Sequence, residues 1–147
     1  MSNKILIIGS TGKLGSSLLK YCYKNNINIS SITCFHNLSK LTKQKKMNSV
    51  KNSFCLSNDY DQLSFIDYLK SKKFKIVYFL DYGFYSLKYL DIILNNNKNC
   101  SIAIANKELL IVGGRILIKK FFSTKNKLFP LDSEHFSLLN SNICNDN

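Results

Sequence analysis

An acidic box near the end of the printed sequence carries the side chains best suited to metal chemistry. Asp132 and Glu134 flank Ser133, and His135 follows them. Carboxylate oxygens are the ligands that Mg²⁺ and Mn²⁺ prefer in proteins. In an extended segment Asp132 and Glu134 would point to the same side, because side chains alternate along a strand. The box therefore predicts a divalent-cation site, with a solvated acidic turn as the alternative.

A glycine-rich turn near the start of the chain could hold phosphate groups. It reads Gly9-Ser10-Thr11-Gly12-Lys13-Leu14-Gly15 and directly follows an apolar run at residues 4–8. A turn between a first strand and a first helix lets backbone N–H groups approach a phosphate, and the helix N-terminus favours its negative charge. Gly12 would permit close approach, and Gly15 would let the helix pack tightly on the strand. We predict a dinucleotide site here, with a plain strand-to-helix turn as the alternative.

The end of the second expected strand bears on the choice between NAD and NADP. NAD-binding folds place an Asp or Glu there to bind the ribose 2′-hydroxyl group. Residues 34–40 contain no carboxylate. A 2′-phosphate would instead be favoured beside His36, Asn37 and Lys40, so the sequence favours NADP(H). An exposed loop histidine without a special role is the alternative for His36.

A third polar group, Ala105-Asn106-Lys107-Glu108, follows a later strand. In open parallel sheets, ligands bind at the carboxyl ends of the strands. Asn106 and Glu108 offer fixed polar groups, and Lys107 offers an ammonium group for a phosphate or a polarised oxygen. In the alternative interpretation, Asn106 is only a helix N-cap and Glu108 a favourable early-helix charge.

These sites must be positioned by strands that alternate with helices. Such alternation indicates βαβ units and an α/β fold with a Rossmann-like, doubly wound parallel sheet. The expected strands are residues 4–8, 29–35, 50–56, 75–80, 101–105 and 127–131. The expected helices are residues 13–24, 38–46, 61–70, 86–95 and 107–123, the last interrupted by Gly113-Gly114.

The charge balance is strongly basic. Lys and Arg outnumber Asp and Glu by 21 to 9, which gives a net charge of +12. Dense positive charge can gather nucleic-acid phosphates. The lysines are spread along the chain, however, and Lys, Asn, Ile, Phe and Tyr are all abundant, as in the product of an AT-rich gene. We therefore favour compositional bias and expect no nucleic-acid partner, although a positive field would still attract small anions.

The cysteines and the apolar runs bear on the compartment. The five cysteines lie far apart and form no Cys-x-x-Cys pair, which fits reduced thiols. The apolar run at residues 4–8 is too short for a signal peptide or a membrane span. We expect a cytoplasmic protein without a membrane partner.

Taken in order, the three blocks resemble 1-deoxy-D-xylulose 5-phosphate reductoisomerase, the NADPH- and metal-dependent enzyme of the non-mevalonate isoprenoid pathway. The likeness rests on the glycine turn, on Ala105-Asn106-Lys107-Glu108 and on Pro130-Leu131-Asp132-Ser133-Glu134-His135. It spans essentially this whole chain but only the N-terminal part of the family protein. It implies an NADPH-binding domain at residues 1–131. Residues 132–147 would then be the start of a catalytic domain that is otherwise missing.

The resemblance also implies a reaction and residue roles. The family rearranges the carbon skeleton of 1-deoxy-D-xylulose 5-phosphate, and NADPH reduces the resulting aldehyde to 2-C-methyl-D-erythritol 4-phosphate. The implied cofactor ligands are Gly9, Ser10, Thr11, Gly12, Lys13, Leu14, His36, Asn37, Asn106 and Glu108. The implied catalytic residues are Lys107 and Glu134. The implied substrate ligands are Lys107, Ser133 and Glu134. Asp132 and Glu134 are the implied ligands of Mg²⁺ or Mn²⁺.

Some positions depart from the family pattern. Lys13 stands where the family usually has Ser, and Phe35 replaces a small residue and could crowd the cofactor. The family is homodimeric, which nothing in this chain supports, and we expect no appreciable turnover from the chain alone. Two alternatives remain: a non-catalytic NADP-binding remnant of the enzyme, and an unrelated NADP-dependent reductase, which would need a catalytic Tyr/Lys pair or an equivalent.

Overall fold

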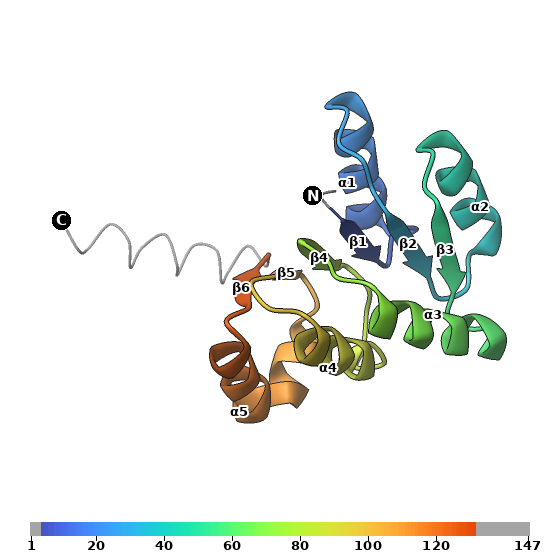
Figure 1. Ribbon diagram of the computed structural model, residues 1–147. Helices are drawn as coiled ribbons and strands as arrows, with labels where there is room; N and C mark the ends of the chain where they lie inside the picture. Colours follow the sequence, from blue (N-terminus) through green and yellow to red (C-terminus); the bar gives the residue numbers. More distant parts are fainter. Residues whose placement is uncertain (1–3, 132–147) are drawn as a thin grey trace.

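A six-stranded parallel sheet forms the centre of the computed structural model, which describes residues 4–131 (Figure 1). The sheet order is β3-β2-β1-β4-β5-β6, and every neighbouring pair is parallel. The predicted doubly wound sheet is therefore confirmed. The strands are β1 (Ile5–Ile8), β2 (Ser31–Cys34), β3 (Asn52–Cys55), β4 (Ile76–Phe79), β5 (Ser101–Ile104) and β6 (Lys127–Pro130).

Five helices connect the strands and cover both faces of the sheet. Helices α1 and α2 lie on one face, and α3, α4 and α5 lie on the other (Figure 1). The helices are α1 (Lys13–Lys24), α2 (Leu38–Met47), α3 (Asp59–Ser71), α4 (Leu87–Asn96) and α5 (Lys107–Thr124). Each follows a strand, as the alternating sequence pattern predicted.

The central strand β1 feeds two separate hydrophobic cores. Leu6 and Ile8 pack with buried residues of α3, α4 and α5, whereas Ile5 and Ile7 pack with those of α1 and α2. Successive side chains of a strand point to opposite faces, so a strand covered on both faces must be apolar throughout. This requirement explains why residues 5–8 form an uninterrupted apolar run.

The order in which strands are added changes direction between β1 and β4. Strands β2 and β3 lie on one side of β1, and β4, β5 and β6 lie on the other. In the register, Ile8 of β1 lies opposite Thr33 of β2 and Phe79 of β4. The carboxyl ends of these three strands therefore reach the same edge of the sheet. In doubly wound folds, ligands bind in the crevice that opens at such a switch point, because the loops on its two sides run apart.

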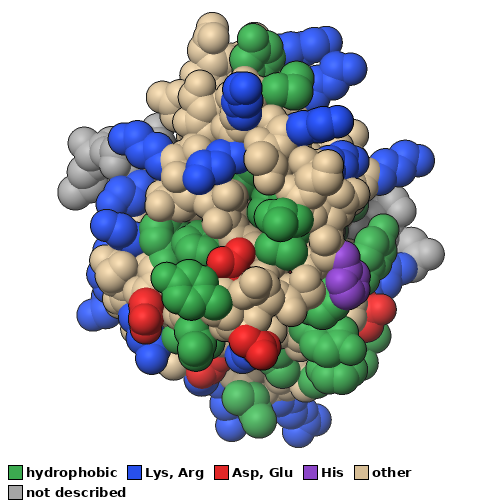
Figure 2. All heavy atoms as spheres, turned by 90° about the vertical axis from the view of Figure 1, so that its right-hand side faces the viewer, with side chains coloured by type: hydrophobic (Ala, Val, Ile, Leu, Met, Phe, Trp, Pro, Cys, Tyr) green, Lys and Arg blue, Asp and Glu red, His purple; other side chains and the backbone are tan. Residues whose placement is uncertain are grey.

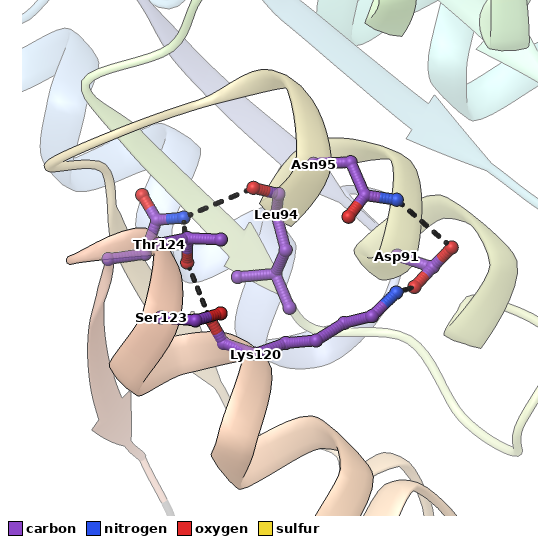
Figure 3. A network of polar contacts seen from close by, with 7 residues as sticks. Asp91, Leu94, Asn95, Lys120, Ser123 and Thr124 are labelled. Atoms are coloured by element: carbon purple, nitrogen blue, oxygen red, sulfur yellow. Dashed lines mark hydrogen bonds and ion pairs between the residues drawn. The ribbon is translucent and has the colours of Figure 1, made fainter.

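Hydrogen bonds of the Asn126 side chain connect α4, β5 and β6. Its side chain accepts from the Cys100 backbone nitrogen at 2.9 Å and donates to the Asn97 carbonyl oxygen at 2.9 Å and to Thr124 Oγ1 at 2.8 Å. Nearby, Lys120 of α5 forms an ion pair with Asp91 of α4 (Figure 3). The end of α4 and the starts of β5 and β6 thus share one buried amide.

Helix α5 contains a break at the predicted position. Gly114 has φ 45° and ψ −137°, outside helical geometry, so two helical segments meet there. A residue without a Cβ adopts such a positive φ at little cost. Among the described residues, none of the helices has the length and apolar character to cross a membrane.

The basic residues are distributed over the surface. In the face shown in Figure 2, Lys and Arg side chains lie mainly around the periphery, and hydrophobic and acidic side chains lie between them. This distribution is compatible with compositional bias as the source of the net charge. The absence of a nucleic-acid partner stays a prediction.

Candidate functional site

Two adjoining hollows lie along the carboxyl edge of the sheet. The larger one, of about 450 Å³, lies between the loops that follow β1, β2 and β4. The smaller one, of about 260 Å³, lies between the start of α1 and the loop that follows β5. Both are lined by Leu80, Asp81 and Tyr82, the residues that follow β4. The two hollows therefore adjoin at the loop that follows β4, beside the switch point.

Most of the site residues predicted among residues 4–131 line the two hollows. The larger hollow is lined by Gly9, Thr11, Gly12, His36 and Asn37. The smaller is lined by Lys13, Leu14, Asn106, Lys107 and Glu108. Segments nearly 100 residues apart in the sequence thus meet at one edge of the sheet, although Ser10 does not line either hollow.

The glycine turn passes between two backbones that leave no room for side chains. Gly9 has φ 87°, and a Cβ there would lie 2.6 Å from the Asp81 backbone nitrogen. A Cβ at Gly15 would lie 2.3 Å from the Gly9 carbonyl oxygen. Both contacts are to backbone, which cannot rotate away. Gly15 thus lets α1 pack tightly, although against the turn that follows β1 and not against the strand itself.

Gly12 occupies a more open position. It is the N-cap residue of α1, and the atom nearest to a Cβ placed on it would be the Gly9 carbonyl oxygen, at 3.7 Å. No side chain caps this helix, and its first turn contains no acidic residue. The N-terminus of α1 thus keeps its favourable potential for an anion and faces the larger hollow.

The Ser10 side chain points into the protein. Its hydroxyl donates to Gln44 Oε1 at 2.8 Å, and Gln44 Nε2 donates back to the Ser10 carbonyl oxygen at 2.8 Å. The backbone nitrogen of Ser10 donates to the Thr33 carbonyl oxygen at 2.9 Å. Ser10 therefore holds the turn against β2 and α2, because its hydroxyl, backbone nitrogen and carbonyl oxygen all have partners inside the protein. Its role as a cofactor ligand stays a prediction.

At the end of β2, His36 and Asn37 are exposed beside the N-terminus of α2. Asn37 caps this helix, because its Oδ1 accepts from the Lys40 backbone nitrogen at 3.0 Å. The first turn of α2 contains no acidic residue, and Lys40 lies in it. This environment suits an anionic group, and a 2′-phosphate at this place stays a prediction.

Asn106 is buried and bonded at both ends of its amide. Its Oδ1 accepts from the Glu108 backbone nitrogen at 3.1 Å, which makes it the N-cap of α5. Its Nδ2 donates to the Gly83 carbonyl oxygen at 2.6 Å. Asn106 is thus the helix N-cap of the alternative interpretation. Its second hydrogen bond, to Gly83, connects the loop after β5 to the loop after β4. Lys107 and Glu108 are exposed at the smaller hollow.

The sequence analysis missed Asp81, the carboxylate at the junction of the two hollows. Burial raises its pKa from 3.8 to about 6, partly opposed by a hydrogen bond from the Ser86 hydroxyl. The charge of Glu108 contributes to the rise in this pKa. Asp81 Oδ1 is buried without a hydrogen-bond partner. Its place just after an apolar strand was the available signal, because that edge of a parallel sheet binds ligands.

The acidic box lies outside the described residues. The predicted roles of Asp132, Ser133 and Glu134 in cation and substrate binding stay predictions. Within residues 4–131, no group of three or more His, Cys, Asp or Glu side chains is placed to hold a metal ion.

A Tyr-x-x-x-Lys spacing occurs at Tyr68 and Lys72, as the reductase alternative would require. Tyr68 lies in the last turns of α3 and its hydroxyl is 3.5 Å from Asn52 Nδ2, at the start of β3. Neither residue lines a hollow. The pair therefore lies toward the opposite edge of the sheet from the candidate site.

The strand order, the glycine turn and the hollows at the switch point define a Rossmann-like α/β domain. Comparison with known proteins narrows this class. The chain is homologous to the N-terminal 40%, approximately, of 1-deoxy-D-xylulose 5-phosphate reductoisomerase. No family model matches the sequence.

Two relatives and one solved structure illustrate the match. The reductoisomerase of Pelagibacter ubique is 38% identical over 163 residues, covering 92% of this chain and 39% of the relative. That of Wigglesworthia glossinidia brevipalpis is 30% identical over 165 residues, covering 94% and 40%. The Zymomonas mobilis enzyme in complex with NADPH superposes with a TM-score of 0.78 at 20% identity, over 92% of this chain and 40% of that one. The chain thus spans about two fifths of the length of these relatives.

Proposed function

We propose that this chain binds NADPH along the two hollows and supplies the nucleotide-binding part of a 1-deoxy-D-xylulose 5-phosphate reductoisomerase. The observation that carries the proposal is the uncapped, acid-free N-terminus of α1 at Gly12, which opens onto the larger hollow. Homology with the reductoisomerases supports the same assignment. When bound, NADPH would supply the hydride that reduces the rearranged sugar phosphate.

The residues present fit a dinucleotide. Backbone N–H groups at Thr11, Gly12 and Lys13 would bind the pyrophosphate, because a helix N-terminus and its open glycine favour anions. His36, Asn37 and Lys40 would hold the 2′-phosphate beside the N-terminus of α2. Two adjoining hollows that share Leu80, Asp81 and Tyr82 would match two nucleosides joined by a bridge.

The other half of the cofactor would lie in the smaller hollow. Asn106 is fixed there by its bonds to Gly83 and Glu108, and Glu108 is exposed. Both would orient the nicotinamide end, and the exposed Lys107 would contact the phosphorylated substrate. Asp132, Ser133 and Glu134 would complete the substrate and cation ligands in this proposal.

Substitutions at Gly12 test the site, because they separate charge from folding. Gly12→Asp and Gly12→Asn both introduce good N-cap side chains of nearly equal size, so both variants should fold. Only the aspartate places a negative charge at the phosphate position. We expect calorimetric titration to show NADPH binding at least tenfold weaker for Gly12→Asp than for Gly12→Asn. Equal binding by the two variants would refute the site.

The NADP preference is measured in the same titrations. NADPH should bind the unmodified chain more tightly than NADH, because the second strand ends without the carboxylate that would accept a ribose hydroxyl. Tighter binding of NADH would contradict the assignment of the 2′-phosphate to His36, Asn37 and Lys40.

A further inference from the structure

Aromatic side chains face each other across the mouth of the larger hollow. Phe35 follows β2 and Tyr85 precedes α4, so the two rings come from opposite sides of the switch point. Their centroids are 5.7 Å apart and their planes are inclined by 23°, a stacked arrangement. Phe35 is 44% exposed and Tyr85 62% exposed, and neither belongs to a hydrophobic core.

The stack continues on both sides of this pair. The His36 ring meets Phe35 edge-on at 4.3 Å, and the Phe84 ring stacks on Tyr85 at 5.2 Å with a 17° inclination. Exposed aromatic rings contribute little to folding, yet their faces bind flat ring systems well. Beneath them, Leu56, Leu80 and Tyr89 give the hollow an apolar wall. These surroundings would bind a ligand that carries a planar, largely apolar ring.

We propose that Phe35 and Tyr85 clamp the adenine base of NADPH between their rings. The inference rests on the proposed function and deepens it, because it assigns the base to two side chains. A base sandwiched between rings needs centroids about 7 Å apart, twice the usual contact distance of ~3.5 Å. The two rings now stack on each other with centroids 5.7 Å apart, so they must separate to admit a base, which two exposed side chains on loops can do by changing rotamer. In this view Phe35, a departure from the small residue usual in the family, is an added contact.

The clamp would recognise the base by its face more than by its edge. Gln62, an amide that lines the same hollow, donates from Nε2 to the Leu56 carbonyl oxygen at 2.7 Å and accepts at Oε1 from Lys88 Nζ at 3.1 Å. Both ends of this amide are already engaged. The hypoxanthine analogue of NADPH should therefore bind within about threefold of NADPH itself, since stacking tolerates changes at the base edge.

The direct test uses half-molecules of the cofactor in calorimetric titrations. Phe35→Ala and Tyr85→Ala should each weaken the binding of 2′,5′-ADP, and of NADPH, about tenfold, within the range for loss of a base–aromatic stack. Reduced nicotinamide mononucleotide lacks adenine and should bind unchanged. Phe122→Ala is the matched control, because Phe122 is an 83% exposed ring on α5 outside both hollows. All three variants remove exposed rings and should keep the circular dichroism of the unmodified chain.

A second measurement reports stacking itself. The chain contains no tryptophan, so Phe35→Trp introduces a single tryptophan, whose fluorescence can be excited selectively, at the clamp. This variant should retain binding, and 2′,5′-ADP should quench its fluorescence.

The outcomes separate the clamp from the proposed function. If Phe35→Ala binds 2′,5′-ADP as well as the unmodified chain does, the clamp is wrong while NADPH binding stands. Tighter binding by Phe35→Ala would also overturn the clamp and identify Phe35 as an obstruction. If the unmodified chain binds neither NADPH nor 2′,5′-ADP, the proposed function fails together with the clamp.

Discussion

Asp81 lies where the two hollows of the candidate site adjoin. It accepts a hydrogen bond from Ser86, the residue before α4, and it lines both hollows. A carboxylate buried there is costly, because one of its oxygens is buried without a hydrogen-bond partner. Proton binding relieves this cost, which explains why the pKa rises to about 6.

This raised pKa predicts a pH-dependent stability. The unfolded pKa is 3.8 and the folded pKa about 6, so the folded protein binds the proton more tightly. The stability from proton binding is then present below about pH 4 and lost as the pH rises through 6. Asp81→Asn keeps an acceptor for Ser86 and removes the charge. It should raise the free energy of unfolding by about 2–3 kcal/mol at pH 8 and by nearly nothing at pH 4.

Urea denaturation at pH 4, 6 and 8 would measure the effect. Asp67→Asn is the control, because it removes an exposed carboxyl group from α3. A stability gap for Asp81→Asn that is the same at every pH would contradict the raised pKa.

Individual residues differ in how far the sequence could place them. The need for glycine at position 15 followed from its place in the turn, and the structure shows a backbone oxygen 2.3 Å from where a Cβ would lie. The inward direction of Ser10 did not follow, because its partner Gln44 is 34 residues away. Asp81 was missed for the same kind of reason: its importance comes partly from neighbours far along the chain, such as Glu108 in α5.

At the scale of elements, local patterns predicted both the helices and their interruption. The break at Gly114 in α5 and the capping of α5 by Asn106 depend on residues close in sequence. Neither required knowledge of the sheet. The cap also has a tertiary role that the sequence does not reveal, since the Asn106 amide donates to Gly83 on the neighbouring loop.

Asn126 should be the most sensitive polar residue of the α4–β5–β6 region. Asn126→Ala leaves the Cys100 backbone nitrogen and the Asn97 carbonyl oxygen without their partner inside the protein. We expect a loss of about 2–3 kcal/mol in the free energy of unfolding, because buried polar groups without partners are costly. Thermal or urea denaturation would measure it.

Asn95→Ala is the matched control for this substitution. Asn95 is exposed on α4, and its side chain donates to Asp91 at 3.4 Å (Figure 3). It should cost well under 1 kcal/mol, the usual range for surface substitutions. Equal losses from the two variants would show that Asn126 does not connect these elements as described.

At the scale of the whole molecule, the parallel sheet converts four distant segments into one site. The loops after β1, β2, β4 and β5 all open at the carboxyl edge, where the two hollows adjoin. Homology to the reductoisomerases extends over 92% of this chain and 39% of the Pelagibacter relative. Nucleotide binding and turnover are therefore separate questions for these 147 residues.

We expect the 147-residue chain by itself to bind NADPH without oxidising it. Asp132 and Glu134 offer two carboxylates, and the described part of the chain adds no cluster able to hold a metal ion. Two carboxylates would hold Mg²⁺ or Mn²⁺ weakly. NADPH absorbance should stay constant after addition of 1-deoxy-D-xylulose 5-phosphate and Mn²⁺. Mn²⁺-dependent oxidation that disappears in Glu134→Gln would show instead that these residues suffice.

The sequence by itself determined the alternating strands and helices, the glycine turn and the polar groups at strand ends. These features follow from hydrophobic periodicity and backbone geometry, which act over a few residues. Only the tertiary structure decided which groups meet. It turned Ser10 inward, brought Phe35 against Tyr85 and placed Asp81 between two hollows, because each of these contacts joins segments that follow different strands. Pairings of that kind depend on strand order and register, which no local pattern contains.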